Sequence, residues 1–247
     1  MAAFLTFDHV DAGYGAVKIL KDLSFQVEEG SILGVIGPNG CGKTTMFNAL
    51  IGLIIPTEGH IKFDGRDITK LPPNKRSRMG LGRTYQVPRP FENMTVFENV
   101  LTAAVQGGGE NERTGAKTAR DALELTGLLP KADVRAGELT LLDRKRLEIA
   151  RALGTEPTLI LLDEVAAGLI DSEIKDIMAL VRSLKDERGL TVIWIEHVIE
   201  TMVHSTDVLM CMSDGHELLI GDPLEVMHSK QVEEVYLGAA EEGEEAV

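Results

Sequence analysis

Cysteines, aromatic residues and long apolar runs are all scarce in this sequence. The 247 residues include only two cysteines, Cys41 and Cys211, too few for a disulfide framework or a cysteine-based zinc site. No stretch reaches the roughly 20 apolar residues of a membrane-spanning helix, and the start of the chain lacks the pattern of a secretory signal. Aromatic residues make up 4% of the chain, so aliphatic side chains must fill the core. We therefore expect a cytosolic protein with one α/β domain, with or without a smaller subdomain.

Positive charge is scarce as well. The chain has 25 lysines and arginines against 39 aspartates and glutamates, which gives a net charge of −14. A protein that neutralises nucleic-acid phosphates requires a basic surface, so we expect no nucleic-acid partner. The acidic run Glu241–Glu245 predicts that residues 238–247 form a solvated, disordered tail.

The pattern of apolar residues indicates an α/β fold. Phe4–Val10 and Leu23–Val27 alternate apolar and polar residues and are predicted to be strands. Farther along, Thr158–Leu162, Thr191–Ile195 and Asp207–Met212 are apolar runs of strand length, separated by helical patterns. Alternation of strands and helices implies parallel strands joined by right-handed crossovers.

The middle of the chain has a helical pattern instead. Residues 87–150 include a helical stretch interrupted by a loop at Gly107–Gly109, and a second helix from about Thr140 to Leu153. We predict that 87–150 form a helical subdomain inserted in the α/β core. Shorter elements are expected at the strands Ser31–Ile36, His60–Phe63 and Gly82–Tyr85, and at the helix Thr44–Leu53.

A glycine-rich loop carries the clearest chemical signal. Gly37–Thr44 fits the pattern G-x-x-x-x-G-K-[ST] between a buried strand and a helix. Glycines let backbone N–H groups approach phosphate oxygens, and the helix adds its positive N-terminal end. Lys43 is placed to reach the β- and γ-phosphates of ATP, and the Thr44 hydroxyl to ligate Mg²⁺. The alternative is a chance glycine-rich turn. The predicted phosphate contacts are Gly37, Pro38, Asn39, Gly40, Cys41, Gly42, Lys43, Thr44 and Thr45.

Two adjacent carboxylates end an apolar strand. Leu159–Leu162 leads directly into Asp163 and Glu164, where Asp163 would hold Mg²⁺ and Glu164 would act as the general base on the attacking water. The alternative is a polar strand end with solvated acids. Two further polar residues follow predicted strands: Gln86 would complete the Mg²⁺ coordination, and His197 would contact the γ-phosphate. Taken alone, Gln86 is equally a surface residue and His197 a structural histidine.

The order of these motifs resembles the ATP-binding subunit of an ABC transporter, over about Phe4 to Leu237. Gly37–Thr44 matches the Walker A motif, Leu159–Glu164 the Walker B motif with its catalytic glutamate, Gln86 the Q-loop and His197 the switch histidine. Tyr14 matches the aromatic residue that stacks on adenine; without that resemblance it would be a tyrosine of a hairpin turn.

The resemblance implies the fold and the ligands. The fold would be an α/β P-loop NTPase core of the ABC type, with a parallel sheet, an N-terminal antiparallel β subdomain and the inserted helical subdomain. Residues 4–237 would form a single ATP-binding domain, which uses ATP with Mg²⁺. Five segments are similar in more detail to branched-chain amino acid importers: Ile68–Pro72, Arg83–Gln86, Met94–Asn99, Arg146–Leu153 and Val235–Gly238.

The signature motif departs from the family pattern. ABC subunits work as dimers in which the signature, usually LSGGQ, meets the ATP of the other subunit; here the stretch reads Leu139-Thr140-Leu141-Leu142-Asp143. Thr140 keeps a hydroxyl for that ATP, and Thr140 with Asp143 keeps the spacing of a capping box. Leu141 and Leu142, however, replace both glycines. Either this is a harmless variant, or the chain pairs with a non-identical sister subunit whose signature is intact.

The segment after the Walker B motif departs too. Val165 replaces the usual proline, and Ile170 holds the position often occupied by aspartate in the D-loop. Asp171, one residue later, is expected to cap the next helix. We expect these changes to weaken communication between the two ATP sites of a dimer. A heterodimer is favoured over a homodimer because Lys43, Glu164 and His197 are intact while the signature is not.

The expected function is ATP hydrolysis that energises an importer, for branched-chain amino acids or related small polar solutes. The partners implied are transmembrane permease subunits, the sister ATPase and, indirectly, a periplasmic substrate-binding protein, with the chain peripheral on the cytoplasmic face of the inner membrane. The alternatives are an ATPase for lipopolysaccharide export, a non-transport ABC ATPase acting on nucleic acid or the ribosome, and a small-molecule kinase that shares only the glycine-rich loop.

Overall fold

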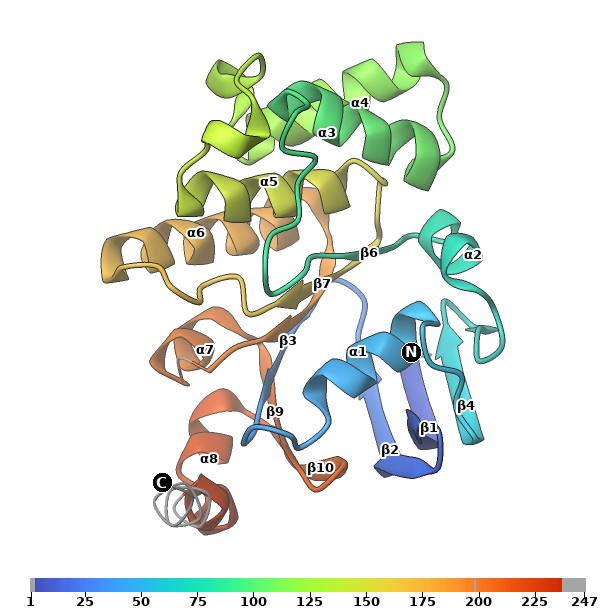
Figure 1. The fold of residues 1–247 in the computed structure, drawn as a ribbon. Coiled ribbons are helices and arrows are strands. Elements are labelled where there is room, and N and C mark those ends of the chain that lie inside the picture. The colour runs from blue at the N-terminus through green and yellow to red at the C-terminus, as the bar shows by residue number, and fades with distance from the viewer. Residues whose placement is uncertain (1–2, 198, 237–247) are drawn as a thin grey trace. The chain divides into compact units, whose positions relative to one another are not determined.

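The computed structural model describes residues 3–197 and 199–236, and in 199–201 only the backbone (Figure 1). The backbone contacts divide the chain into two compact units. The first is formed by the chain up to Pro72 and from Ile193 onward, and the second by Pro73–Val192. The predicted acidic tail, 238–247, and the predicted domain end at Leu237 lie outside the described residues.

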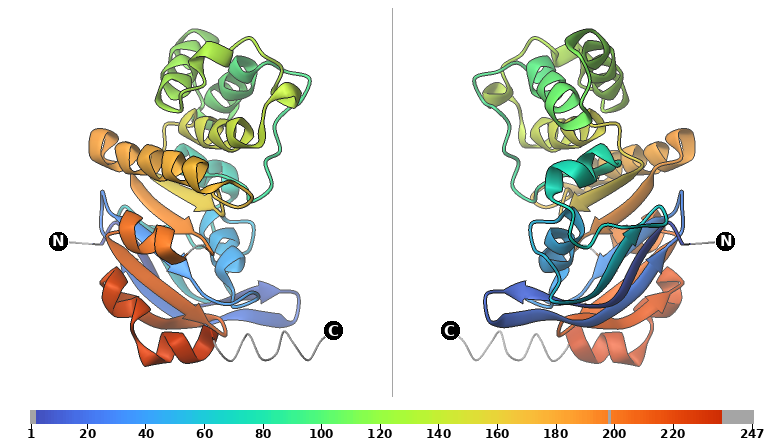
Figure 2. Two further views of the ribbon diagram at one scale, coloured as in Figure 1. Left: turned by 90° about the vertical axis from the view of Figure 1, so that its left-hand side faces the viewer. Right: turned by 90° about the vertical axis from the view of Figure 1, so that its right-hand side faces the viewer.

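The first unit contains an antiparallel sheet. Its long hairpin, β1 (Leu5–Tyr14) and β2 (Val17–Val27), is seen from two sides in Figure 2. At the start of β1, Leu5 and Phe7 are buried while Thr6 and Asp8 are only partly buried, and Phe7 stacks on Phe25 of β2 with ring centroids 4.7 Å apart. The sheet contains, in spatial order, β2 (Val17–Val27), β1 (Leu5–Tyr14), β4 (Glu58–Phe63) and β5 (Arg66–Asp67). The expected N-terminal antiparallel β subdomain is therefore present.

The same unit carries parallel strands. All five residues of β3 (Ile32–Ile36) are buried, and β3 pairs in parallel with β9 (Val208–Ser213), so that Ile36 lies opposite Cys211. A buried strand needs apolar residues on both faces, and a parallel pair needs a crossover between its strands. Helix α1 (Lys43–Ile51) follows β3 directly, with only the loop 37–42 between them. The remaining elements of this part are α7 (Ile199–Ser205), the antiparallel edge strand β10 (His216–Gly221) and α8 (Pro223–Met227).

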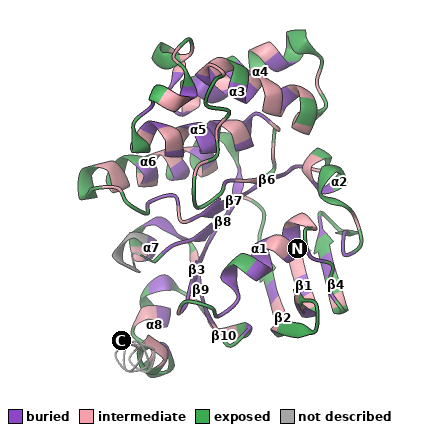
Figure 3. Cartoon of the chain, viewed as in Figure 1, coloured by how far each residue is buried: buried purple, intermediate pink, exposed green. Residues whose placement is uncertain are grey.

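The second unit is mainly helical around one parallel strand pair. Strand β6 (Leu81–Arg83) pairs with β7 (Leu159–Asp163), and β7 is buried throughout. Helix α6 (Asp171–Arg188) buries Ile177, Val181 and Leu184 on one face, as the spacing of these residues predicts, while much of the rest of the helix is exposed (Figure 3). The helices are α2 (Pro73–Arg78), α3 (Val96–Thr102), a π-helical turn (Ala103–Gly108), α4 (Glu112–Leu125), α5 (Leu141–Leu153) and α6 (Asp171–Arg188). Strand β8 (Thr191–Ile195) then leads back to the first unit.

Several boundaries differ from the sequence-based expectation. Strand β1 runs on to Tyr14, because its pairing with Val17 closes the hairpin at Gly15 and Ala16. Strand β6 ends at Arg83, so Gln86 lies in the loop beyond it. The predicted loop at 107–109 is mostly the last part of the π-helical turn, which ends at Gly108. Among the described residues, no helix is long and apolar enough to cross a membrane.

Candidate nucleotide-binding site

The glycine-rich loop has a backbone that only glycine adopts easily. Gly37, Gly40 and Gly42 have φ angles of 145°, 80° and 110°, in the region that disfavours side chains. At Gly37 a Cβ atom would stand 2.3 Å from the carbonyl oxygen of Met212 in β9. The loop is thus held against the parallel strands, and Gly42 provides the N-cap of α1. A glycine-rich loop between a buried strand and a helix N-terminus is the arrangement in which backbone N–H groups bind phosphate.

Lys43 and Thr44 begin α1. The Lys43 side chain is buried, and its ammonium donates hydrogen bonds to the carbonyls of Gly37 (2.7 Å) and Pro38 (2.9 Å). A buried cation needs such acceptors or an anion, so the loop presents one positive charge to an incoming phosphate. Thr44 is exposed while Thr45 is buried. Of the two hydroxyls, that of Thr44 is therefore the accessible one.

Tyr14 is held in place at the end of β1. The residue is 53% exposed, and its hydroxyl accepts a hydrogen bond of 2.8 Å from the side-chain amide of Asn48 in α1. The side chain is thus held beside the helix that follows the phosphate loop and remains accessible. An exposed, fixed aromatic face is suitable for stacking on a nucleobase.

The phosphate loop is supported by three packed residues, of which the sequence predicts only Cys41. Cys41 and Cys211 are both buried free cysteines. Burial raises the pKa of both thiols, that of Cys211 to about 11, so both are packed neutral groups. Burial likewise raises the pKa of Tyr236, which receives a backbone hydrogen bond from Gly37. The segment Val235–Gly238 was noted only as a family resemblance, with no reason to place Tyr236 against the loop.

In the second unit, Asp163 ends β7 in a buried position. One carboxylate oxygen, Oδ2, accepts a hydrogen bond of 2.8 Å from Arg83 in β6. The other, Oδ1, is buried without a hydrogen-bond partner. Burial raises the pKa of Asp163, and the neighbouring Arg83 guanidinium acts in the opposite direction. A buried carboxylate oxygen left without a donor is the kind of atom that a metal ion or its bound water satisfies.

Glu164, the next residue, is held in an uncommon conformation. Its φ angle is 48°, a left-handed backbone that redirects the chain at the strand end. The Gln86 side-chain amide donates to its carboxylate over 2.5 Å. The ammonium of Lys145, in α5, donates to the carbonyls of both Gln86 (2.8 Å) and Glu164 (2.9 Å). Lys145 therefore joins two residues that the sequence assigns to catalysis.

Lys145 was not singled out from the sequence. A signal was available, because Lys145 lies on the same helical face as Ile149 and Ala152, both buried. A lysine on a buried face requires acceptors for its charge. Arg83 is a similar case. It ends β6 opposite Leu161 of β7, and its guanidinium pairs with the buried carboxylate of Asp163, two residues farther along β7.

His197 follows β8 in the first unit. The residue is exposed, whereas its neighbour Glu196 is buried and accepts a hydrogen bond of 3.1 Å from the indole of Trp194. The strand end thus anchors Glu196 inward and leaves His197 at the surface. The proposed contact of His197 with a phosphate stays a prediction.

Comparison with known proteins decides the family. The family model described as "ABC transporter" matches residues 20–167. The chain is 36% identical to the high-affinity branched-chain amino acid transport ATP-binding protein BraF of Pseudomonas aeruginosa, over 92% of this chain and 94% of that protein. The chain belongs to the ABC transporter family of ATPases.

Other relatives and solved structures agree with this family. The lipopolysaccharide export system ATP-binding protein LptB of Acidithiobacillus ferridurans is 35% identical over 96% of the chain and 98% of that protein. An ATP-binding cassette of an ABC transporter in its ADP conformation matches with a TM-score of 0.88 and 31% identity, covering 96% of this chain and all of that one. A dimeric cassette bound to ADP and phosphate matches with a TM-score of 0.78 and 25% identity, covering 89% and 98%. The predicted α/β P-loop fold of the ABC type is therefore confirmed.

The stretch that the sequence predicts to be the signature motif lies at the start of α5. Thr140 is the N-cap: its hydroxyl accepts from the backbone N–H of Asp143 (3.3 Å) and donates to the Asp143 carboxylate (2.9 Å). That carboxylate also pairs with Lys131. The predicted cap is confirmed, but Asp143 bonds the hydroxyl and Lys131 rather than completing a capping box. Leu141 is 46% exposed, so an apolar side chain stands at the surface where the ABC pattern has glycine.

The predicted D-loop also presents an apolar residue. Ile170 occupies the N-cap position of α6 and is 66% exposed. The expectation that Asp171 caps this helix is wrong, because Asp171 is already its first residue. The Glu173 carboxylate instead accepts from the backbone N–H of Ile170 over 3.1 Å, which satisfies one of the free N–H groups at the helix start.

Proposed function

We propose that this chain is the ATP-binding and ATP-hydrolysing subunit of an importer for branched-chain amino acids or related small polar solutes. The proposal rests on the hydrogen bonds that join Gln86, Lys145 and Glu164. Lys145 bonds the carbonyls of the other two residues, and the Gln86 amide bonds the Glu164 carboxylate at the end of β7, which fixes that carboxylate as a general base requires. The similarity to BraF over most of both chains supports the solute class.

In this proposal the phosphate loop binds the triphosphate of ATP. Lys43 would exchange its carbonyl acceptors for the β- and γ-phosphate oxygens, and the fixed ring of Tyr14 would stack on adenine. Lys43 would exchange one set of acceptors for another, and Tyr14 is already held by Asn48, so little reorganisation of these two side chains is required. His197 would contact the γ-phosphate and so distinguish ATP from ADP.

The residues present also fit Mg²⁺. This ion is usually held by one or two carboxylates together with substrate phosphates and water, and the described residues contain no larger cluster of metal-binding side chains. Asp163 has a buried oxygen without a donor, Thr44 an exposed hydroxyl and Gln86 an amide oxygen. When bound, Mg²⁺ would neutralise charge on the phosphates. Glu164 would take the proton of the attacking water.

Replacement of Glu164 by glutamine tests the catalytic assignment. Glu164→Gln keeps the size and the backbone of the residue but removes the base, so ATP binding should persist and turnover should fall at least a hundredfold. A fluorescent-nucleotide titration and a phosphate-release assay measure the two properties. Wild-type turnover in the variant would show that Glu164 is not the base.

We further propose that the chain works in a dimer with a non-identical sister ATPase. The apolar Leu141 and Ile170 stand exposed where the ABC pattern has glycine and aspartate, which favours a partner that supplies an intact signature. The similarity to a dimeric cassette supports the dimer itself. ATPase activity should be low for the chain alone and should rise when the second ATPase of the same transporter is added. Equal turnover per subunit without that partner would contradict the heterodimer.

Lipopolysaccharide export is the second candidate, because LptB is nearly as similar as BraF. Both functions place the chain at the cytoplasmic face of the inner membrane, bound to permease subunits. Purification of the tagged chain from membranes, followed by mass spectrometry, distinguishes them. Amino acid permeases and a periplasmic binding protein encoded nearby support import, whereas export permeases would overturn it.

A further inference from the structure

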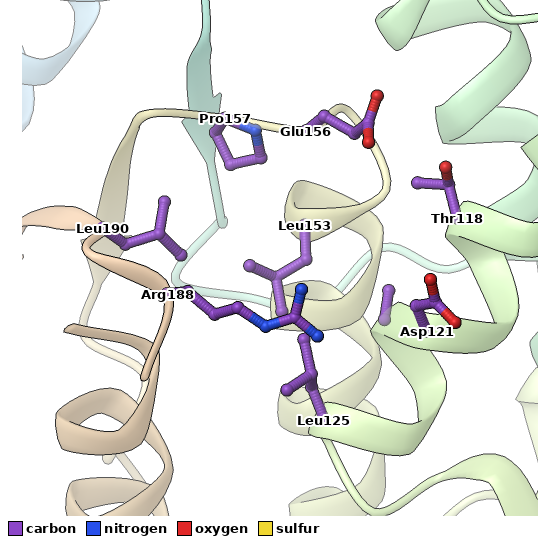
Figure 4. A pocket seen from close by; sticks show the side chains of 9 residues that line it. Thr118, Asp121, Leu125, Leu153, Glu156, Pro157, Arg188 and Leu190 are labelled. Atoms are coloured by element: carbon purple, nitrogen blue, oxygen red, sulfur yellow. The ribbon is translucent and has the colours of Figure 1, made fainter. Parts of the chain in front are cut away.

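A pocket of about 230 Å³ opens within the second unit (Figure 4). Its walls come from the second half of α4, the turn after α5 and the end of α6. None of its residues belongs to the phosphate loop, the Walker B motif, the Q-loop or the signature. The lining residues are Thr118, Asp121, Ala122, Leu125, Leu153, Glu156, Pro157, Arg188 and Leu190.

The floor of the pocket is apolar. Leu153 and Leu190 are 7% and 6% exposed, and Leu125 is half-buried against them. Ala122 and Pro157 complete the floor. Such a surface favours an aliphatic group, because removal of both surfaces from water is stabilising.

Charges of both signs surround this floor. Figure 4 shows the Arg188 side chain, from the end of α6, extending towards α4, which carries Asp121. Within residues 3–197 and 199–236, the side chains of Arg188 and Asp121 form no hydrogen bond or ion pair with each other or with other groups. A guanidinium and a carboxylate therefore face the same small pocket, and neither is neutralised by the other.

The acidic side of the pocket is crowded. Burial, together with the nearby carboxylates of Glu110 and Asp121, raises the pKa of Glu156, and Lys117 only partly offsets this. Glu156 also has a φ angle of 50°, an uncommon backbone for a residue with a side chain. A cation bound beside Asp121 and Glu156 would relieve the repulsion between these carboxylates.

We propose that this pocket binds a small aliphatic α-amino acid of about the size of leucine. The aliphatic side chain would rest on Leu125, Leu153 and Leu190. The α-carboxylate would pair with the planar donors of Arg188, and the α-ammonium with Asp121 and Glu156.

Size and charge both support this ligand. The pocket is smaller than the roughly 300–1,000 Å³ of sites for drug-sized molecules, so a nucleotide does not fit it. An anion would meet the carboxylates, and a simple amine would leave Arg188 unused. A zwitterion matches both sides of the pocket, because it can form charge-assisted hydrogen bonds with Arg188 on one side and with Asp121 and Glu156 on the other. The inference stands apart from the proposed transport function, because it requires no nucleotide, permease or sister subunit.

Calorimetric titration of the full chain with L-leucine tests the proposal. Two analogues remove one charge each: 3-methylbutylamine lacks the carboxylate and 4-methylpentanoate lacks the ammonium. L-Leucine should bind at least tenfold more tightly than either analogue. Binding of either analogue as tight as that of L-leucine, or no binding of L-leucine at millimolar concentration, would overturn the proposal.

Variants locate the binding. Arg188→Gln and Asp121→Asn should each weaken leucine binding about tenfold, which corresponds to about 1.4 kcal/mol. Arg182→Gln changes an exposed arginine of the same helix that does not line the pocket, so it should bind as the wild type does. Lys43→Ala should lose ATP and keep leucine, which separates this site from the nucleotide site. Equal affinity in Arg188→Gln and Arg182→Gln would place any bound leucine elsewhere.

Discussion

Replacement of Lys145 by methionine would remove the group that joins the Q-loop to the Walker B motif. The Lys145 side chain is 2% exposed, and its ammonium donates to the carbonyls of Gln86 and Glu164. Methionine has a similar length without the charge or the donors. The variant therefore tests whether this buried cation holds the two residues in their catalytic positions.

The magnitude follows from the two carbonyls left behind. Each buried carbonyl that loses its donor costs about 1–3 kcal/mol. The variant also avoids the cost of burying the lysine charge, which offsets part of this loss. We expect Lys145→Met to lower the free energy of unfolding by about 2–4 kcal/mol. The turnover number should fall about tenfold or more, because misplacement of a catalytic group by 1 Å can cost about a hundredfold. The affinity for ATP should change little, since the phosphate loop is intact.

Urea unfolding followed by far-UV circular dichroism measures the first effect, and steady-state ATPase kinetics of the assembled transporter measure the second. Arg146→Met is the matched control. The adjacent Arg146 forms an ion pair of 3.3 Å with Asp176, whose side chain is 60% exposed. Loss of such an exposed ion pair should lower the free energy of unfolding by less than about 1 kcal/mol. If both variants unfold at the same urea concentration and turn over ATP at the same rate, Lys145 has no positioning role.

Three smaller changes test other parts of the site. Gly37→Ala should abolish ATP binding, because its Cβ would meet a backbone carbonyl at 2.3 Å. The Cβ of Gly40→Ala would meet no neighbouring atom and would cost only the strain of a φ angle of 80°, about 1–2 kcal/mol, so this variant should weaken ATP binding far less in a nucleotide titration. Cys41 and Cys211 should resist iodoacetamide at pH 8 in the native protein, because their raised pKa values keep the thiols protonated. Both should react in urea, and rapid alkylation of the native protein, seen by mass spectrometry, would contradict this. Thr140→Ala should lower the free energy of unfolding by about 1 kcal/mol through loss of the α5 cap, and Thr140→Ser should restore it in thermal unfolding.

The phosphate loop and its neighbours could be predicted from sequence because their signals are local. Glycines at set spacings, a lysine and a threonine lie between an apolar run and a helix, and the structure places Gly37–Thr44 in that arrangement. The buried face of α6 was likewise available from the spacing of Ile177, Val181 and Leu184. In each case the residues that decide the structure are close together in the chain.

Contacts between segments that are distant in the sequence could not be predicted in this way. The hydrogen bond from Lys145 to Gln86 spans 59 positions, and no local pattern specifies which carbonyls a buried lysine finds. The sequence does not predict β10 for another reason. This strand lies at a sheet edge and most of its residues are only half-buried, so its pattern of apolar residues is weak. The roles of His197 and Thr140 towards ATP stay predictions, since they depend on a nucleotide and a second subunit.

The support of the phosphate loop by residues 208–236 has a consequence during synthesis. Strand β3 pairs with β9, Gly37 packs against Met212, and Tyr236 accepts a bond from the Gly37 backbone. A chain still on the ribosome with residues 208–236 not yet emerged lacks all three supports, although its glycine-rich motif has long been made. Because contacts so far apart in sequence form late, nascent chains should acquire nucleotide affinity only after residues 208–236 have left the ribosome. Nucleotide capture would then retain nascent chains that expose this segment and not shorter ones.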